Sequence, residues 1–140
     1  MKANIKPCIE RHLVEKAKGG NTVQPGDWFD TADAHLVSVA AIINNDPNGA
    51  IILTWAAMLK TGKGLAATGG YRLQDETHGK IVDFRVFDWL TDQEKGIIRS
   101  IQMGRNAAAY DNPKLVNKGL AGAAFNLARP MLTNARSYLD

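Results

Sequence analysis

The stretch Asn44–Trp55, NNDPNGAIILTW, contains both a strong helix stop and the apolar run that decides the predicted fold. Pro47 disfavours the helical conformation in the residue before it, and Gly49 can adopt the positive φ of a turn, so a helix that arrives here is expected to end. The run Ile51–Trp55 that follows is short, β-branched and continuously apolar. It predicts a strand buried on both faces, although a helix continuing through Leu59 would have the same apolar character.

Two helices are expected before this stop. The first spans Lys2–Lys18, where apolar residues recur at helical spacing, and Gly19-Gly20 ends it. A loop containing Pro25-Gly26 follows. Asp30 or Thr31 can cap the second helix, because their side-chain oxygens accept the free N–H groups of a first helical turn. The apolar stripe of that helix consists of Leu36, Val37, Ala40, Ala41 and Ile43.

Two more strands are expected beyond residues 60–70, KTGKGLAATGG, which have the composition of a glycine-rich loop. They cover residues 71–74 and 80–87 and would form a hairpin. In the second of them Val82, Phe84 and Val86 share one face. With the strand at about 50–56, these segments make a predicted three-stranded sheet.

A capping box opens the first C-terminal helix: the Thr91 hydroxyl can accept the Glu94 amide, and Glu94 can reach back to the Thr91 amide. The core face of this helix is expected to contain Ile97, Ile98, Ile101 and Met103 or Gly104.

The last helix is expected to begin at Asn112-Pro113, with a cap followed by a proline at the first helical position. Its interior, Gly119–Phe125, is made of small residues that let another helix approach closely, either in the same chain or in a second copy. Pro130 is expected to kink or break it. The predicted fold class is therefore α+β: two N-terminal helices, a small three-stranded sheet and two C-terminal helices.

The chain has 140 residues, of which 45% are hydrophobic and 22% charged, as expected for a single globular domain over residues 1–140. The single cysteine, Cys8, excludes an intramolecular disulfide. No secretory signal pattern and no run of about 18 apolar residues is present, so no membrane segment is expected and the predicted location is the cytoplasm.

The net charge of +3 is distributed unevenly. Residues 1–18 have five Lys or Arg against two acids, a local charge of +3, and residues 19–59 have no base against four Asp, a local charge of −4. Residues 91–140 have seven bases against four acids, again +3. Such a division suits contact with a charged partner, and it places an acidic candidate surface at residues 27–46 and a basic one on the C-terminal helices.

Two familiar site patterns are present in part. Residues 60–70 resemble an anion-binding loop, but the lysine that the P-loop pattern requires after Gly64 is missing. Cys8 and His12 have the spacing of a thiol and its base on one helix face, without an identifiable group to orient the histidine.

Trp28-Phe29 is the best candidate for a protein-contact anchor, because Trp is enriched at interface hot spots. The alternative is that both rings fill the core. With the neighbouring Asp30 and Asp33, the pair defines a candidate partner-binding site.

Gly70-Tyr71-Arg72, His78-Gly79 and Asp83-Phe84-Arg85 resemble the segments S-G-Y-R and S-x-H-x-x-G-x-A-x-D of the zinc D-Ala-D-Ala carboxypeptidase and phage endolysin family. The resemblance covers about residues 31–105. It implies a zinc peptidase with His78 and Asp83 as metal ligands. The family's last zinc ligand is a histidine near the C-terminus, and this chain has no histidine after His78.

Three functions follow as hypotheses. The first is a non-catalytic interaction protein without a cofactor, for example a small phage or mobile-element accessory factor that binds and modulates another protein and can form a homodimer. The second is a zinc-dependent peptidoglycan peptidase or its catalytically degenerate relative. The third is nucleic-acid binding through the basic residues of the C-terminal helices, Lys114, Lys118, Arg129 and Arg136.

Overall fold

The computed structural model describes residues 14–16, 23–73, 87, 89–110 and 118–139. Its elements in chain order are β1 (Val14–Lys16), α2 (Pro25–Ile42), α3 (Pro47–Thr68), β2 (Tyr71–Leu73), α4 (Asp92–Tyr110), α5 (Lys118–Arg136) and the 3-10 helix η3 (Ser137–Leu139).

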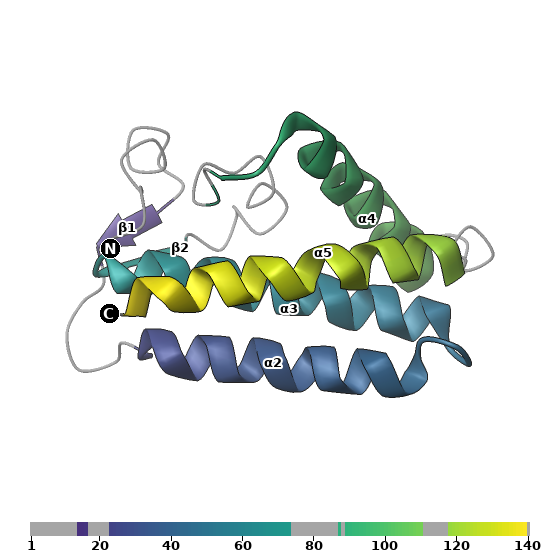
Figure 1. The fold of residues 1–140 in the computed structure, drawn as a ribbon, viewed down its shortest axis with the longest axis horizontal. Helices are drawn as coiled ribbons and strands as arrows, with labels where there is room; N and C mark the ends of the chain where they lie inside the picture. The colour runs from purple at the N-terminus through teal and green to yellow at the C-terminus, as the bar shows by residue number, and fades with distance from the viewer. Residues whose placement is uncertain (1–13, 17–22, 74–86, 88, 111–117, 140) are drawn as a thin grey trace.

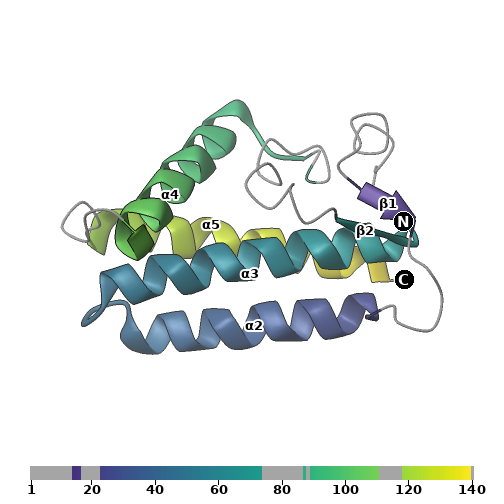
Figure 2. The same cartoon turned by 180° about the vertical axis from the view of Figure 1, so that it is seen from behind.

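Three long helices form the body of the fold. In Figure 1, α2, α3 and α5 lie side by side along the long axis, with α2 antiparallel to the other two, while α4 leans away from them. Figure 2 shows the same arrangement from behind, with the strands close to the C-terminal end of α3. Helix α3 packs against α2, α5 and α4, so it is the central element of the core.

The predicted α+β fold is wrong, because residues 50–56 belong to α3 and the described residues contain no three-stranded sheet. The strand prediction for Tyr71–Leu73 is confirmed, but its partner is β1: Val14 lies opposite Leu73 and Lys16 opposite Tyr71 in an antiparallel pair. The helix predicted over Lys2–Lys18 is therefore wrong at β1, and the rest of it lies outside the described residues. Of the strand predicted at 80–87, only Phe87 is described, and it is buried outside any strand.

Burial on nearly all sides explains why the start of α3 has the sequence pattern of a strand. A helix that packs against several neighbours loses the alternation of apolar and polar residues that marks an amphipathic helix. Two buried polar side chains are satisfied within the helix, since the Thr54 and Thr61 hydroxyls donate to the carbonyls of Ala50 and Ala57 at 2.7 and 2.8 Å. The buried residues are Ala50, Ile51, Thr54, Trp55, Ala57, Met58, Thr61, Gly62, Gly64, Leu65 and Ala66.

The residues predicted as a glycine-rich loop form the last two turns of α3. Gly64 lies directly under the Phe29 ring of α2: a Cβ at this position would overlap Phe29 Cε1 and lie 2.6 Å from Cδ1. Gly64 is therefore a close-packing residue. The helix ends at Thr68, and Gly70, with φ of 81°, turns the chain into β2.

The helix stop predicted at residues 44–49 is confirmed, although Gly49 lies inside α3 and does not adopt the positive φ expected of a turn. Helix α2 ends at Ile42, and the Asp46 amide donates to the Ile42 carbonyl at 2.7 Å. Asp46 then caps α3, since its Oδ1 accepts the Gly49 amide at 2.9 Å, and Pro47 takes the first helical position, where its missing N–H has no consequence.

Helix α2 begins earlier than predicted, and a different face of it is buried. It starts at Pro25, in the segment expected to be a loop, because proline is well tolerated at the first helical position. Its buried residues are Phe29, Ala32, Leu36 and Val39. Of the predicted apolar stripe only Leu36 is buried in this helix, and Val37 is 57% exposed.

The capping box of α4 is confirmed: the Glu94 amide donates to Thr91 Oγ1 at 3.1 Å, and the Thr91 amide donates to Glu94 Oε1 at 3.0 Å. Ile98 and Ile101 lie in the core as expected. Of the two alternatives at the end of this face, Gly104 is buried and Met103 is 73% exposed.

Replacing Thr91 by alanine is expected to lower the free energy of unfolding by about 1 kcal/mol, because the capping interactions at the start of α4 are lost. Urea denaturation measures the change. Ser100→Ala is the control, because the exposed Ser100 hydroxyl donates to the Gly96 carbonyl of the preceding turn, at 3.2 Å, and caps no helix end. Equal losses in the two variants would contradict the prediction.

Helix α5 continues through Pro130, so the predicted break at this residue is wrong. The proline lies on the exposed side of the helix. Of the small residues before it, Ala121 and Ala124 are fully buried in the core shared with α2 and α3, whereas Gly119 and Ala123 are exposed. The predicted start at Asn112-Pro113 lies outside the described residues.

Candidate functional site

Adjacent side chains of helix α2 point in different directions. Its period of 3.6 residues separates positions 28 and 30 by about 200°, so Trp28 and Asp30 lie on opposite sides of the helix. Phe29, between them, points into the core. The predicted partner-binding residues, Trp28, Phe29, Asp30 and Asp33, therefore do not form one surface.

Phe29 is fully buried, with 0% of its surface exposed. Its ring lies over Gly64 of α3. Phe29 is therefore a core residue, and its predicted place on the contact surface is wrong. The alternative, in which the ring fills the core, is confirmed for Phe29.

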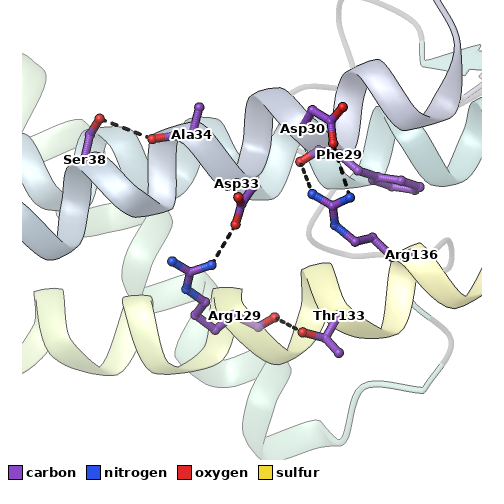
Figure 3. A network of polar contacts seen from close by, with 8 residues as sticks. All are labelled: Phe29, Asp30, Asp33, Ala34, Ser38, Arg129, Thr133 and Arg136. Carbon is purple, nitrogen blue, oxygen red and sulfur yellow. Dashed lines mark hydrogen bonds and ion pairs between the residues drawn. The ribbon is translucent and has the colours of Figure 1, made fainter.

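Asp30 and Asp33 face α5 and pair with its arginines (Figure 3). Arg129 Nη1 lies 2.8 Å from Asp33 Oδ1, and Arg136 Nη1 lies 3.2 Å from Asp30 Oδ1. Arg136 also donates through Nη2 to the Phe29 carbonyl at 3.5 Å. The acidic and basic surfaces predicted as separate sites thus meet in one seam, and four of the predicted contact residues hold α2 against α5.

The Asp33–Arg129 pair is expected to contribute only about 0.2–1 kcal/mol to stability, because the side chains of Arg129 and Asp33 are 39% and 43% exposed. A double-mutant cycle with Asp33→Asn and Arg129→Gln measures this coupling. It should shrink in about 1 M salt, which screens exposed charges. A coupling energy above this range that does not change with salt would contradict the expectation, because it would mean that the two side chains are shielded from solvent.

Trp28 lies on the other flank of α2, where it meets two lysines of α3. Lys63 Nζ lies 5.0 Å from the centre of a Trp28 ring, and Lys60 Nζ lies 6.0 Å from it. Both distances are within the range of a cation–π interaction. All three side chains are partly exposed. We call these residues, together with His35, the Trp28 patch.

His35 belongs to the patch because it lies two helical turns beyond Trp28 on α2, and because the positive charge of Lys60 acts on its imidazole. Burial lowers the pKa of His35 below its ordinary value, and the positive Lys60 lowers that pKa further. The folded state therefore binds this proton less readily than the unfolded chain.

This lowered pKa predicts a loss of stability as the pH falls through the unfolded-state value of about 6.5, because the unfolded chain then takes up a proton that the folded chain resists. The free energy of unfolding of the wild type should decrease more between about pH 7.5 and about pH 5.5 than that of His35→Gln. Chemical denaturation across this range measures both curves. Parallel curves would contradict the prediction.

Sequence reasoning placed Lys60 and Lys63 in a candidate anion-binding loop and not beside Trp28, and it assigned His35 to no site. The sequence places the lysines in a predicted loop, whereas their spacing of three makes them neighbours on one helix once α3 is known. A helix predicted over residues 47–68 would have placed the two lysines side by side.

Most other predicted site residues lie outside the described residues. These are Cys8, His12, His78, Asp83 and Lys114, so the predicted thiol pair and the predicted zinc ligands stay predictions. Lys118 is exposed at the start of α5. In the part of the chain that the structure describes, no group of three or more His, Cys, Asp or Glu side chains could hold a metal ion.

Comparisons with protein-family models, with curated proteins and with solved structures found no match. None of the described helices is both long enough and apolar enough to cross a membrane.

Proposed function

We propose that this protein is a non-catalytic interaction protein that contacts another protein through the Trp28 patch. The observation that carries the proposal is the position of Trp28: its indole is partly exposed on the outer side of the α2–α3 pair, with Lys63 and Lys60 over its ring. Tryptophan is among the residues most enriched at the energetic centres of protein interfaces.

The support for Trp28 as an anchor is its fixed surroundings. Phe29, the next residue, is locked in the core, and α2 packs along α3. The two lysines restrict the ring from the α3 side. A side chain already held in position loses little conformational freedom on binding, and more of the contact energy is then available for affinity.

The test is capture of partners from a lysate of the source organism by tagged wild-type protein and by Trp28→Ala, with identification by mass spectrometry. Val37→Ala is the matched control, because Val37 is another exposed apolar residue of α2, at 57% exposure, outside the patch. The proposal predicts a protein retained by the wild type and by Val37→Ala but lost from Trp28→Ala. If Trp28→Ala retains every protein that the wild type retains, the proposal fails.

The competing hypotheses receive no support from the described residues. His78 and Asp83 of the zinc-peptidase hypothesis are not described. Arg129 and Arg136 of the nucleic-acid hypothesis are engaged with α2 carboxylates. The origin as a phage or mobile-element factor and a homodimeric state stay predictions.

A further inference from the structure

The first turn of α3 contains a pair of residues that is chemically labile in peptides. Asn48 is the only asparagine of the chain that glycine follows. Glycine has no side chain to shield its amide nitrogen and adopts many backbone conformations, so this nitrogen easily reaches the amide carbon of a preceding asparagine. The labile pair lies at the start of the central helix, at the end of the bundle where α2 turns into α3 (Figure 1).

The cap of α3 explains why glycine occupies position 49. Asp46 Oδ1 accepts the Gly49 amide at 2.9 Å, which satisfies one of the free N–H groups of the first turn. A Cβ at position 49 would overlap Asp46 Oδ2 and lie 2.9 Å from Asp46 Cγ. A larger residue would therefore displace the capping carboxylate. The cap depends on the same residue that makes Asn48 labile.

This cap also restrains the nucleophile of a deamidation reaction. The Gly49 nitrogen must lose its proton to attack Asn48 Cγ, and in the folded chain that proton is donated to the Asp46 carboxylate. A neighbouring negative charge opposes the loss of a proton. The helical backbone of Asn48 also fixes the dihedral angle ψ that must rotate before the nitrogen can approach the side chain.

The amide group under attack is restrained as well. Attack on Asn48 Cγ would place a negative charge on Asn48 Oδ1. This oxygen is buried and has no hydrogen-bond partner among the described residues. A buried oxyanion without a donor is costly, which is the reverse of the arrangement that stabilises such a charge in enzymes. Both reacting groups therefore become reactive only when the first turn of α3 opens.

We infer that Asn48 is a latent modification site, which the Asp46 cap protects and which deamidates when the start of α3 opens. In the open turn the Gly49 nitrogen bonds to Asn48 Cγ, its proton passes through water to the leaving NH₂ group, and ammonia is released. Water then opens the resulting succinimide at either carbonyl group and gives aspartate or isoaspartate. Local opening of this kind is typical of helix ends and needs no global unfolding.

Deamidation is expected to prevent α3 from closing again. Isoaspartate inserts an extra backbone atom into the first turn, and aspartate places a charge where the buried Asn48 Oδ1 lies. The favourable interaction of a carboxylate with a helix N-terminus offsets only part of that cost. Because α3 packs against α2, α4 and α5, a transient opening of this turn becomes a permanent loss of stability.

The test measures deamidation of Asn48 by peptide mass spectrometry while the full-length protein is incubated at mildly alkaline pH, in buffer and in urea. The wild type should react much more slowly in buffer than in urea, where the turn is open. In buffer Asp46→Ala should react about fivefold faster than the wild type, the factor by which the loss of an N-cap favours the open turn. Asp46→Ser keeps a capping oxygen and should keep most of the protection.

Thr91→Ala is the matched control, because it removes the cap of α4 and leaves the start of α3 unchanged. Its rate of deamidation at Asn48 should stay within about twofold of the wild-type rate. Similar acceleration in Asp46→Ala and Thr91→Ala would overturn the role of the cap, because the reaction would then pass through global unfolding. Equal wild-type rates in buffer and in urea would overturn protection by the fold, and this comparison remains decisive if Asp46→Ala does not fold.

The effect of the modification is measured on protein aged in urea and returned to buffer. Aged wild type should unfold at a lower urea concentration than fresh wild type. Aged Asn48→Gln, which lacks the labile pair, should unfold at the same concentration as its own fresh sample. Equal midpoints for fresh and fully deamidated wild type would overturn the expected loss of stability.

Discussion

Replacing Gly64 by alanine is expected to lower the free energy of unfolding by about 1–3 kcal/mol, although alanine is the better helix former. A Cβ at this position would overlap Phe29 Cε1 and lie 2.6 and 2.8 Å from Cδ1 and Cζ of the same ring. The ring is fully buried and cannot swing into solvent. Accommodating the methyl group therefore requires α2 to move away from α3, along the most extensive helix contact among the described elements.

Two other glycines provide matched controls for Gly64→Ala. A Cβ added at Gly96 in α4 or at Gly122 in α5 would meet no described atom within 4 Å beyond its own helical turn, so alanine is free to fit there. Each control should raise stability by about 0.5–1 kcal/mol through the higher helix propensity of alanine. Urea denaturation of the three variants gives the comparison. If Gly64→Ala were stabilised as much as the controls, the close approach of Phe29 to α3 would be wrong.

Replacing Phe29 by alanine is expected to have the largest effect of all, a loss of about 3–5 kcal/mol, because the substitution leaves a cavity between α2 and α3. Phe29 belongs to the main core cluster, together with Leu36, Leu65 and Met58. Since small proteins are stable by only about 5–15 kcal/mol, Phe29→Ala removes a large share of the total.

The contact between the two positions can be tested separately from their individual effects. In the Phe29→Ala background the ring that blocks a Cβ on α3 is gone, so Gly64→Ala should cost much less than in the wild type. The difference between the two costs is the coupling energy of a double-mutant cycle, expected at about 0.5–3 kcal/mol for residues in contact. Additive effects would show that the two residues do not meet. Phe29→Leu provides a milder background if Phe29→Ala does not fold.

Features with a local chemical cause could be predicted from the sequence. The Thr91–Glu94 capping box forms as expected because its partners are three residues apart and need nothing from the rest of the chain. The helix stop before Pro47 and the strand at Tyr71–Leu73 also follow from local residue preferences.

The central helix could not be predicted because its sequence pattern depends on what surrounds it. Ile51–Trp55 is apolar except for Thr54 since α3 is covered by three other helices, and the same pattern fits a buried strand. The glycines of residues 60–70 favour a loop, whereas Gly64 is small to make room for Phe29. A prediction of strand and loop for α3 also hides the lysines of the Trp28 patch, because only a helix makes them neighbours.

Only part of the candidate site could be predicted, for a similar reason. The sequence drew attention to Trp28-Phe29 and to the acidic residues beside them, but it could not show that one ring is buried and the other partly exposed. Nor could it show that Asp33 and Arg129, which are 96 residues apart, form an ion pair. Both facts depend on where α3 and α5 lie around α2.

The most direct test of the different roles of Trp28 and Phe29 is the difference between the unfolding free energies of Trp28→Ala and Phe29→Ala, measured by urea denaturation under the same conditions. We expect Phe29→Ala to lose about 3–5 kcal/mol. Trp28→Ala should lose only about 1–2 kcal/mol, the contribution of two exposed cation–π contacts and partial burial. Equal losses in the two variants would show that Trp28 is a core residue like its neighbour, and would contradict its role as the anchor of a contact surface.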